Sequence, residues 1–433
     1  MLTELLLENW KSYEQARVSI DALTVLIGTN ASGKSNALDA FAFLNRIAHG
    51  TALTAALQGD GVLPALRGGV EWAARRPHAS FAVGVTCRAD EQTDYQYRLE
   101  CTLSDSRCEV LSEQLTRVRY RLDRNSLRKR DSVLGQIKLF RTDPCEIASP
   151  TVTARLYNEK QGSPRQVSRV QSVLTHLVGQ KLRQEIQEGV GVVVAALRDI
   201  FILDPIPSHM RGYSPLNERL DSDARNIAGV IAALPQEKQK SIESVLTRYA
   251  RKLPEKDIRR VYAEPVGKFK SDAMLYCEEQ WSDSGDPPTV DARGMSDGTL
   301  RFLAILTALL TRPRHSLLVI EEVDNGLHPS RARMLLDMLR TVGEEQEVDV
   351  LVTTHNPALL DAMGAEMVPF ITVAHRNPHS GLSQLTLLEN MKKLPKLLAQ
   401  GSIGKLSSNG AIEKALQLEM DFSAAEQQES VHV

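Results

Sequence analysis

The sequence lacks any apolar run near the ~20 residues that a membrane-spanning helix needs, and its amino terminus "MLTELLLENWKSYEQ" carries acids and no cleavable apolar signal. We therefore expect a cytoplasmic protein with no membrane partner. Its five cysteines are an odd number at scattered positions, which excludes a disulfide framework and a cysteine zinc site. The formal net charge of −2 excludes a globally basic nucleic-acid binder, so any such surface must be local.

Internal repeats and sustained heptads are also absent, which excludes a repeat array and an extended coiled-coil arm. We expect strands, a loop and a helix in residues 1–111, with antiparallel strands in "FAVGVTC" and "YQYRLECTL". Residues 112–264 have helical apolar spacing and predict an inserted, mainly helical subdomain. Residues 265–375 predict a second lobe of strands and helices, and residues 376–433 a C-terminal extension.

A complete G-x-x-x-x-G-K-[ST] pattern occurs in "GTNASGKSN", after the apolar run "LTVLI" and before "NALDAFAFLNRIA". A loop between a buried strand and a helix points backbone N–H groups and the positive helix end at phosphates. Lys34 would reach the outer phosphates, and the Ser35 hydroxyl would bind Mg²⁺. The alternative is a plain glycine-rich turn. We predict a nucleotide-binding loop formed by Gly28, Asn30, Gly33, Lys34, Ser35 and Asn36.

Two adjacent carboxylates, Glu321 and Glu322, follow the run Leu317 to Ile320, which has the pattern of a buried parallel strand. One carboxylate can hold Mg²⁺ while the other orients or deprotonates the water that attacks the γ-phosphate. Successive side chains of a strand point in opposite directions, so the two acids cannot have the same role. We assign Glu321 to the metal and Glu322 to the water; the alternative is a solvated acidic turn.

His355 follows the next apolar run, Val348 to Thr353. A lone histidine is more often structural, but its position one strand after the paired acids predicts a contact with the γ-phosphate. Ser296 and Gly298 open the strongly apolar segment "TLRFLAILTALL". They offer a second helix N-terminus to an anion, or they form only a helix cap.

The order of these four motifs resembles that of ABC-type ATPase heads, and specifically the non-transporter branch of SMC, RecF and the OLD-like ATPases of prokaryotes. "ENWKSY" is similar to the segment before the phosphate loop in that branch, and "EEVDNGLHP" to its acid pair and following loop. "FILDPIPSHMRG", "LDSDARNIAGVI" and "GSIGKLSSNG" extend the resemblance less specifically. It implies an α/β P-loop NTPase of ABC-ATPase type with an antiparallel β layer, ATP and Mg²⁺ as cofactors, and ATP hydrolysis.

The resemblance also implies a head-to-tail homodimer, in which Ser296 and Gly298 of one subunit close on the ATP held at Lys34 of the other. The sequence departs from the transporter pattern in two places. The signature reads "SDGT" where transporters have "SGGQ", and Glu321 stands where aspartate is common. A transporter subunit is further disfavoured by the long separation between Lys34 and Ser296.

Nucleases of the OLD type carry a C-terminal TOPRIM domain, for which residues 356–433 are too short and contain no Asp-x-Asp. We therefore expect no intrinsic nuclease. The resemblance to ATPase subunits of two-gene anti-phage systems such as Septu and PARIS implies an ATPase that senses DNA or a foreign factor and controls a separately encoded effector, for example a nuclease. The alternative is a RecF-like ATPase in DNA repair or chromosome maintenance.

Three arginines, Arg117, Arg119 and Arg121, recur at every second position. On a strand they would share one face and contact DNA phosphates. The alternative is a solvated polar face.

Overall fold

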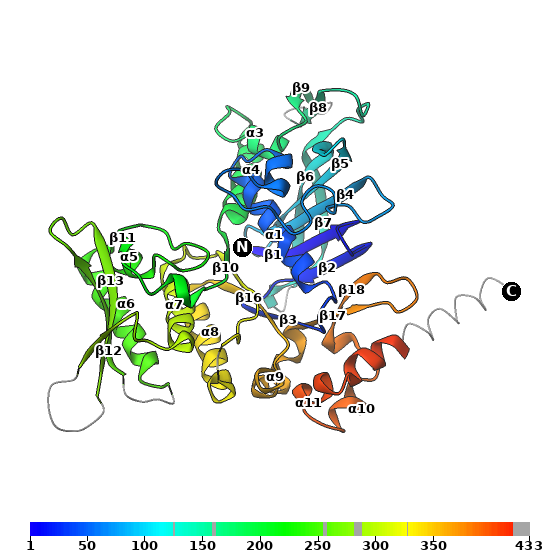
Figure 1. The fold of residues 1–433 in the computed structure, drawn as a ribbon. Coiled ribbons are helices and arrows are strands. Elements are labelled where there is room, and N and C mark those ends of the chain that lie inside the picture. The colour runs from blue at the N-terminus through cyan, green and yellow to red at the C-terminus, as the bar shows by residue number, and fades with distance from the viewer. Residues whose placement is uncertain (124–125, 158–161, 254–257, 281–287, 327, 419–433) are drawn as a thin grey trace.

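The computed structural model describes residues 1–123, 126–157, 162–253, 258–280, 288–326 and 328–418. An eight-stranded sheet lies above a six-stranded sheet in Figure 1, and a four-stranded sheet with its helices forms a lobe at the left. No helix of these described residues is long and apolar enough to cross a membrane.

The eight-stranded sheet is antiparallel, in the order β2-β1-β4-β5-β6-β7-β8-β9. Helix α4 covers part of it, and Gly189 permits close packing because a Cβ there would lie 2.3 Å from Leu139 Cδ1. The strands are β1 (Leu2–Glu8), β2 (Gln15–Ser19), β4 (Ser80–Arg88), β5 (Thr93–Ser104), β6 (Arg107–Asp123), β7 (Ser126–Thr142), β8 (Thr151–Leu156) and β9 (Ser163–Ser168). Beside them lie α1 (Lys34–Ala48), α2 (Leu53–Gln58), α3 (Val173–His176) and α4 (Gln184–Arg198).

Strands β6 to β9 correct the prediction of a mainly helical segment from residue 112 onward. Residues 132–138 of β7 are exposed, so pairing with β6 and not burial of apolar side chains holds them in the sheet. Hydrophobic periodicity detects only strands with a buried face. The predicted domain boundaries after residues 111, 264 and 375 each fall inside a strand, namely β6, β12 and β17.

The six-stranded sheet has the order β10-β15-β16-β3-β17-β18, and every neighbouring pair except β17 with β18 is parallel. Successive side chains of β3 face two different cores: Val25 packs with α7 (Asp297–Thr311) and α8 (Ala332–Gln346), whereas Leu26 packs with α1. Both faces are therefore covered, as a parallel sheet requires. The strands are β3 (Leu23–Ile27), β10 (Ile200–Leu203), β15 (Leu317–Ile320), β16 (Asp349–Thr354), β17 (Ile371–Arg376) and β18 (Ser383–Leu387).

The left lobe contains β11 (Ser214–Pro215), β12 (Ile258–Val266), β13 (Asp272–Glu279) and β14 (Thr289–Asp291), packed with α5 (Ile227–Ala232) and α6 (Gln236–Ala250). Helices α7 (Asp297–Thr311) and α8 (Ala332–Gln346) join this lobe to the central sheet, as Figure 1 shows. The chain continues through α9 (Pro357–Met363), α10 (Leu394–Leu398), α11 (Ile403–Ser408) and helical residues 411–418. Short 3₁₀ turns are η1 (Pro207–His209), η2 (Pro329–Arg331), η3 (Ala365–Phe370) and η4 (Leu388–Asn390).

Candidate nucleotide-binding site

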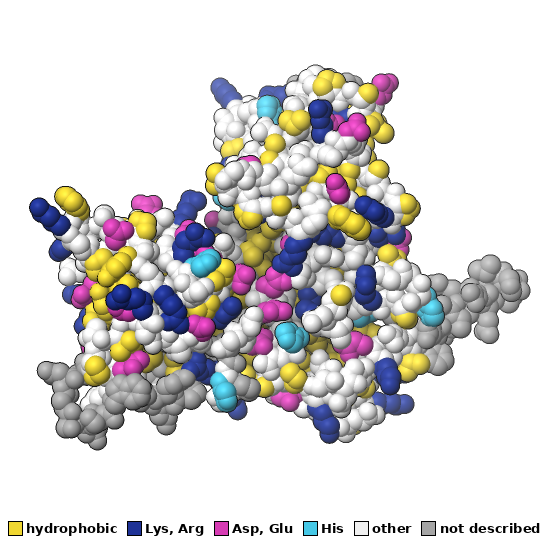
Figure 2. Space-filling view, in the orientation of Figure 1, with side chains coloured by type: hydrophobic (Ala, Val, Ile, Leu, Met, Phe, Trp, Pro, Cys, Tyr) yellow, Lys and Arg dark blue, Asp and Glu magenta, His cyan; other side chains and the backbone are white. Residues whose placement is uncertain are grey.

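Three neighbouring parallel strands, β15, β16 and β3, end at the same edge of the central sheet. Their register pairs Ile320 with Val352 and Thr354 with Ile27. The phosphate loop follows β3, the acid pair follows β15, and His355 follows β16. The fold therefore brings together three motifs that the sequence keeps far apart, at the edge where ligands of open α/β sheets bind. Figure 2 shows acidic, basic and histidine side chains gathered near the middle of one face of the molecule.

The phosphate loop requires glycine at two positions. Gly28 has a φ of 144° and Gly33 a φ of 112°, values that residues with a Cβ rarely adopt. A Cβ on Gly28 would lie 2.1 Å from the carbonyl oxygen of Ala374, and one on Gly33 would lie 2.7 Å from the Tyr13 hydroxyl. The glycines therefore let the loop pack directly against β17 and the N-terminal segment.

Lys34 begins α1, and its ammonium group lies inside the loop. It donates hydrogen bonds to the carbonyl oxygens of Gly28 (2.6 Å) and Thr29 (3.0 Å). Burial lowers the pKa of Lys34, and three nearby carboxylates oppose that shift: Glu322, Glu321 and Glu413. Nucleotide phosphates entering the loop would compete with these oxygens for the ammonium group.

The segment before the loop braces it. Tyr13 donates a hydrogen bond to the carbonyl oxygen of Gly33 (2.9 Å), and the Trp10 indole donates to the carbonyl oxygen of Asn36 (2.7 Å). The Asn36 side chain donates to Ser12 (2.7 Å), so it holds the bracing segment. Asn30 is exposed at the tip of the loop.

Ser35 and Glu321 meet directly, because the Ser35 hydroxyl donates a short hydrogen bond to the Glu321 carboxylate. Arg67 binds the same carboxylate through both terminal nitrogens, at 3.1 and 2.5 Å. Burial of Glu321 favours its protonation, but the hydrogen bonds from Arg67 and Ser35 outweigh burial and lower its pKa. An ionised carboxylate beside a hydroxyl suits a magnesium ion that also binds phosphate and water.

Glu322 has surroundings different from those of Glu321. Its backbone adopts a φ of 48°, and its N–H donates to the Thr353 hydroxyl (2.8 Å). One carboxylate oxygen lies 3.9 Å from Nδ1 of His355, and the other accepts a hydrogen bond from Asn325 (3.3 Å). The side chains of Glu322 and His355 are 44% and 55% exposed, so a bound substrate could reach both.

The signature turn lies at the start of α7. The Ser296 hydroxyl caps this helix by accepting a hydrogen bond from the backbone N–H of Thr299 (3.1 Å). A Cβ on Gly298 would lie 2.6 Å from an Arg331 nitrogen and 3.1 Å from the Gly326 carbonyl oxygen, so the loop after the acid pair packs onto this turn. Helices α7 and α1 pack on opposite faces of the central sheet. The fold does not bring the signature of a chain to its own phosphate loop.

Sequence reasoning missed two charged residues of the site. Arg67 lies in the segment after α2 and contacts Glu321 and Asp39, yet no pattern around it marks a nucleotide site. Glu413 lies in helical residues 411–418, close enough to Lys34 for each to affect the pKa of the other. Burial raises the pKa of Glu413, and its Oε2 atom is buried without a hydrogen-bond partner among the described residues.

The three candidate DNA-binding arginines do lie on strand β6, as their spacing predicted. Arg117 is mostly buried and faces α4, where Glu185 lies 3.4 Å away. Arg119 and Arg121 are exposed. Only two of the three guanidinium groups are therefore available to an external partner.

Two family models match the chain, and together they include all four motifs. Residues 203–361 match a model described as "AAA domain, putative AbiEii toxin, Type IV TA system", and residues 1–66 match one described as "AAA ATPase domain". No curated protein matches the chain at a significant level. Both matches are to AAA ATPase domains, and with the parallel sheet that carries the phosphate loop they support the prediction from the motif order, an ATPase head with a P-loop fold.

Solved structures of SMC head domains are similar over most of the chain. The SMC head domain from Thermotoga maritima is 14% identical, with a TM-score of 0.41, over 89% of this chain and 98% of that one. An Smc head bound to the C-terminal domain of ScpA, derived from Pyrococcus furiosus, is 13% identical, with a TM-score of 0.45, over 92% and 98%. An Smc head bound to the C-winged helix domain of ScpA is 15% identical, with a TM-score of 0.47, over 89% and 96%.

Proposed function

We propose that this chain binds ATP with Mg²⁺, hydrolyses the ATP, and uses the cycle to regulate a separately encoded effector. The observation that carries the proposal is the meeting of Lys34, Ser35 and both carboxylates at one sheet edge. A phosphate loop alone would support binding only. The second carboxylate, placed beside a histidine, provides the groups that hydrolysis needs.

The loop residues would bind and neutralise the phosphates. Lys34 would exchange the carbonyl oxygens of Gly28 and Thr29 for phosphate oxygens. Ser35 and Glu321 would hold Mg²⁺, which when bound neutralises charge on the phosphates. No group of three or more His, Cys, Asp or Glu side chains in the described ranges could hold a metal ion by itself, which fits an ion that takes its other ligands from phosphate and water.

Glu322 and His355 would act on the γ-phosphate. Glu322 would orient the attacking water and accept its proton, because its carboxylate is partly exposed and held by Asn325. His355 would donate a hydrogen bond to the γ-phosphate from the neighbouring strand end. The roles of Glu322 and His355 come in addition to the neutralisation of phosphate charge. A protein that only binds nucleotide, without hydrolysing it, would not need them.

Two subunits would complete each site. Ser296 and Gly298 would bind the γ-phosphate of the ATP held at Lys34 of a second copy, since their helix lies across the sheet from their own loop. Helix α7 would then supply backbone N–H groups and a positive helix end to that phosphate. ATP would thus close a head-to-tail homodimer, and hydrolysis would open it.

A role in anti-phage defence is supported by the description of the model that matches residues 203–361. That description names a putative toxin of a toxin–antitoxin system. We propose that DNA or a foreign factor changes the ATPase rate and so controls the effector.

The experiment that tests this function is steady-state phosphate release, with and without duplex DNA, with the Glu322→Gln variant as blank. Turnover above the blank supports hydrolysis at this site, and stimulation by DNA supports a DNA-responsive ATPase. A rate of phosphate release that is the same with and without DNA would favour a protein as the activating partner. Equal rates for wild type and Glu322→Gln would contradict the assigned chemistry.

A further inference from the structure

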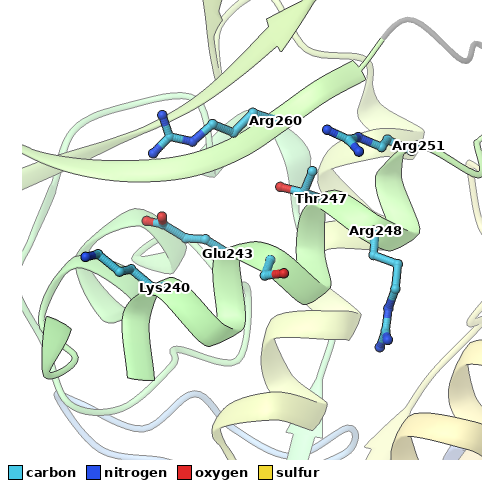
Figure 3. Close-up of a pocket in the computed structure, with 7 residues that line it drawn as sticks. Lys240, Glu243, Thr247, Arg248, Arg251 and Arg260 are labelled. Carbon is cyan, nitrogen blue, oxygen red and sulfur yellow. The ribbon is translucent and has the colours of Figure 1, made fainter. Parts of the chain in front are cut away.

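The left lobe has a groove of about 540 Å³ between α6 and β12, lined by Lys240, Glu243, Ser244, Thr247, Arg248, Arg251 and Arg260 (Figure 3). We propose that this groove binds the phosphate backbone of a nucleic-acid duplex. The inference rests on the DNA response proposed above and names the surface responsible for it.

The floor of the groove is a polar seam, a row of hydrogen bonds between side chains of the α6 segment and the backbone of β12. Strand β12 is the last strand of its sheet, and its outer edge would otherwise expose unpaired backbone groups. Side chains four residues apart, two on α6 and one at the residue that follows it, bind this edge instead. The backbone N–H of Ala263 donates a hydrogen bond to Glu243 (3.1 Å), and that of Val261 donates to the Thr247 hydroxyl (3.0 Å). The Arg251 guanidinium donates to the Arg259 carbonyl oxygen (2.6 Å).

The seam also contains the one negative charge among the lining residues of the groove. Glu243 is the sole acid among the lining residues, and its Oε1 atom accepts hydrogen bonds from Ala263 and from Gln239 (2.9 Å). These neutral donors hold the carboxylate in place without cancelling its charge. The groove is net positive because four cations, Lys240, Arg248, Arg251 and Arg260, stand against this one acid among the lining residues.

The walls carry cations on the next stripe of the helix and on the strand. Lys240 and Arg248 are exposed on α6, and in the described ranges neither has a carboxylate within ion-pair distance. Arg260 of β12 lies over the Tyr262 ring at 4.4 Å and 3.6 Å from Glu278. Figure 3 shows Lys240 and Arg260 reaching toward the same end of the groove from opposite walls.

The spacing of these cations suits a repeating anion. Lys240 and Arg248 are eight positions apart, which on an α-helix corresponds to about 12 Å. Phosphates of each strand of a duplex recur about every 3.4 Å along the axis, so a backbone laid along the helix offers several of them. Ser244 lies between the two cations, and serine hydroxyls are common donors to nucleic-acid phosphates.

The hairpin between β12 and β13 extends the positive surface. It carries Lys268 and Lys270, both exposed, on either side of Phe269, which is 87% exposed. Because α6 runs antiparallel to β12 along the seam, its amino-terminal end and this turn lie toward the same end of the strand. A backbone that follows the groove would continue toward these lysines.

The test is a fluorescence-anisotropy titration of a labelled DNA duplex of arbitrary sequence, using the full chain. The variant Lys240→Glu with Arg248→Glu is compared with Arg119→Glu with Arg121→Glu, which makes the same change in net charge on β6. We expect the groove variant to lose affinity about tenfold or more, and the β6 variant to lose much less. Equal losses, or a loss only in the β6 variant, would overturn the groove assignment.

A second measurement separates contact from general charge. With Lys240→Gln and Arg248→Gln, the slope of log affinity against log salt should become shallower by about two, since two phosphate contacts are lost. An unchanged slope contradicts the proposal. Basal phosphate release and melting temperature should match wild type, because both side chains are exposed and outside the seam. A variant that loses DNA binding but keeps ATP turnover would support the groove without affecting the proposed ATPase activity. The groove proposal and the ATPase proposal can therefore be tested separately.

Discussion

Ser35 and Glu321 are 286 residues apart in the sequence, yet the hydroxyl of one donates a hydrogen bond to the carboxylate of the other. The contact joins the first turn of α1, which follows β3, to the residue after β15, a strand that β16 separates from β3 in the sheet. It places a hydroxyl and an ionised carboxylate beside the Lys34 ammonium group. The predictions that follow concern this arrangement.

Lys34→Ala should strongly weaken ATP binding. The ammonium group is the cation placed inside the loop, and its loss leaves the phosphates to backbone N–H groups alone. Titration with a fluorescent ATP analogue measures the effect, which we expect to be about a hundredfold or more. Equal affinity of variant and wild type would contradict the role of the loop.

Two inactive variants should complement each other if the signature acts across the dimer. In a mixture of Lys34→Ala and Ser296→Arg, a mixed dimer has one site with an intact loop and an intact signature. Phosphate release should therefore partly recover, although each variant alone is inactive. Absence of recovery, with mixed dimers seen by light scattering, would argue against sites shared between subunits.

Arg67→Ala should make ATP hydrolysis more sensitive to acid. Arg67 is the largest contributor among the groups that lower the pKa of Glu321, so its removal raises that pKa and Glu321 is protonated at higher pH. The acid limb of the rate profile should move upward by about one pH unit. Arg67→Lys should show a smaller movement, and an unmoved acid limb in the alanine variant would show that Arg67 does not set this ionisation.

Glu413→Gln should strengthen ATP binding. The Glu413 carboxylate lies near Lys34, where nucleotide phosphates would bring further negative charge. Removal of a like charge should lower the dissociation constant by about threefold to tenfold, with a smaller effect at high salt. Lys414→Gln, an exposed neighbour on the same helical segment, is the matched control. Unchanged or weaker binding by Glu413→Gln would refute the repulsion.

Asp349→Asn should stabilise the fold above neutral pH. Burial at the start of β16 raises the pKa of Asp349 from an ordinary value near 3.8 to about 7. Between these pH values the folded state keeps a proton that the unfolded state has released, so the free energy of unfolding falls as the pH rises. Above about pH 7 the folded state carries the full cost of an ionised, buried carboxylate. Asparagine removes that cost.

Melting temperatures near pH 4 and pH 8 measure the effect on stability. The gain of Asp349→Asn over wild type should be a few kcal/mol at the higher pH, because each tenfold change in proton affinity is worth about 1.4 kcal/mol. It should nearly vanish at the lower pH. Asp337→Asn, at an exposed position on α8, should show no such dependence. A gain independent of pH would point to packing and not to charge.

The elements of the site with strong local patterns were predictable. The strands before the phosphate loop, the acid pair and His355 all consist of buried residues, so continuous apolar runs marked them. Ser296 was also predicted correctly as a helix start, since a serine before an apolar helix is a local signal. The long strands β6 and β7 were missed because much of their length is polar and exposed on the surface.

The phosphate loop and the helix caps could be predicted from the residues alone, because they depend on backbone conformations and spacings within a few residues. Packing of the whole chain is what makes β15, β16 and β3 neighbours, pairs Arg67 with Glu321, and brings Glu413 near Lys34. It also placed a polar seam and a row of cations along α6. Contacts between distant segments depend on how whole sheets and helices pack, and no local periodicity records that packing.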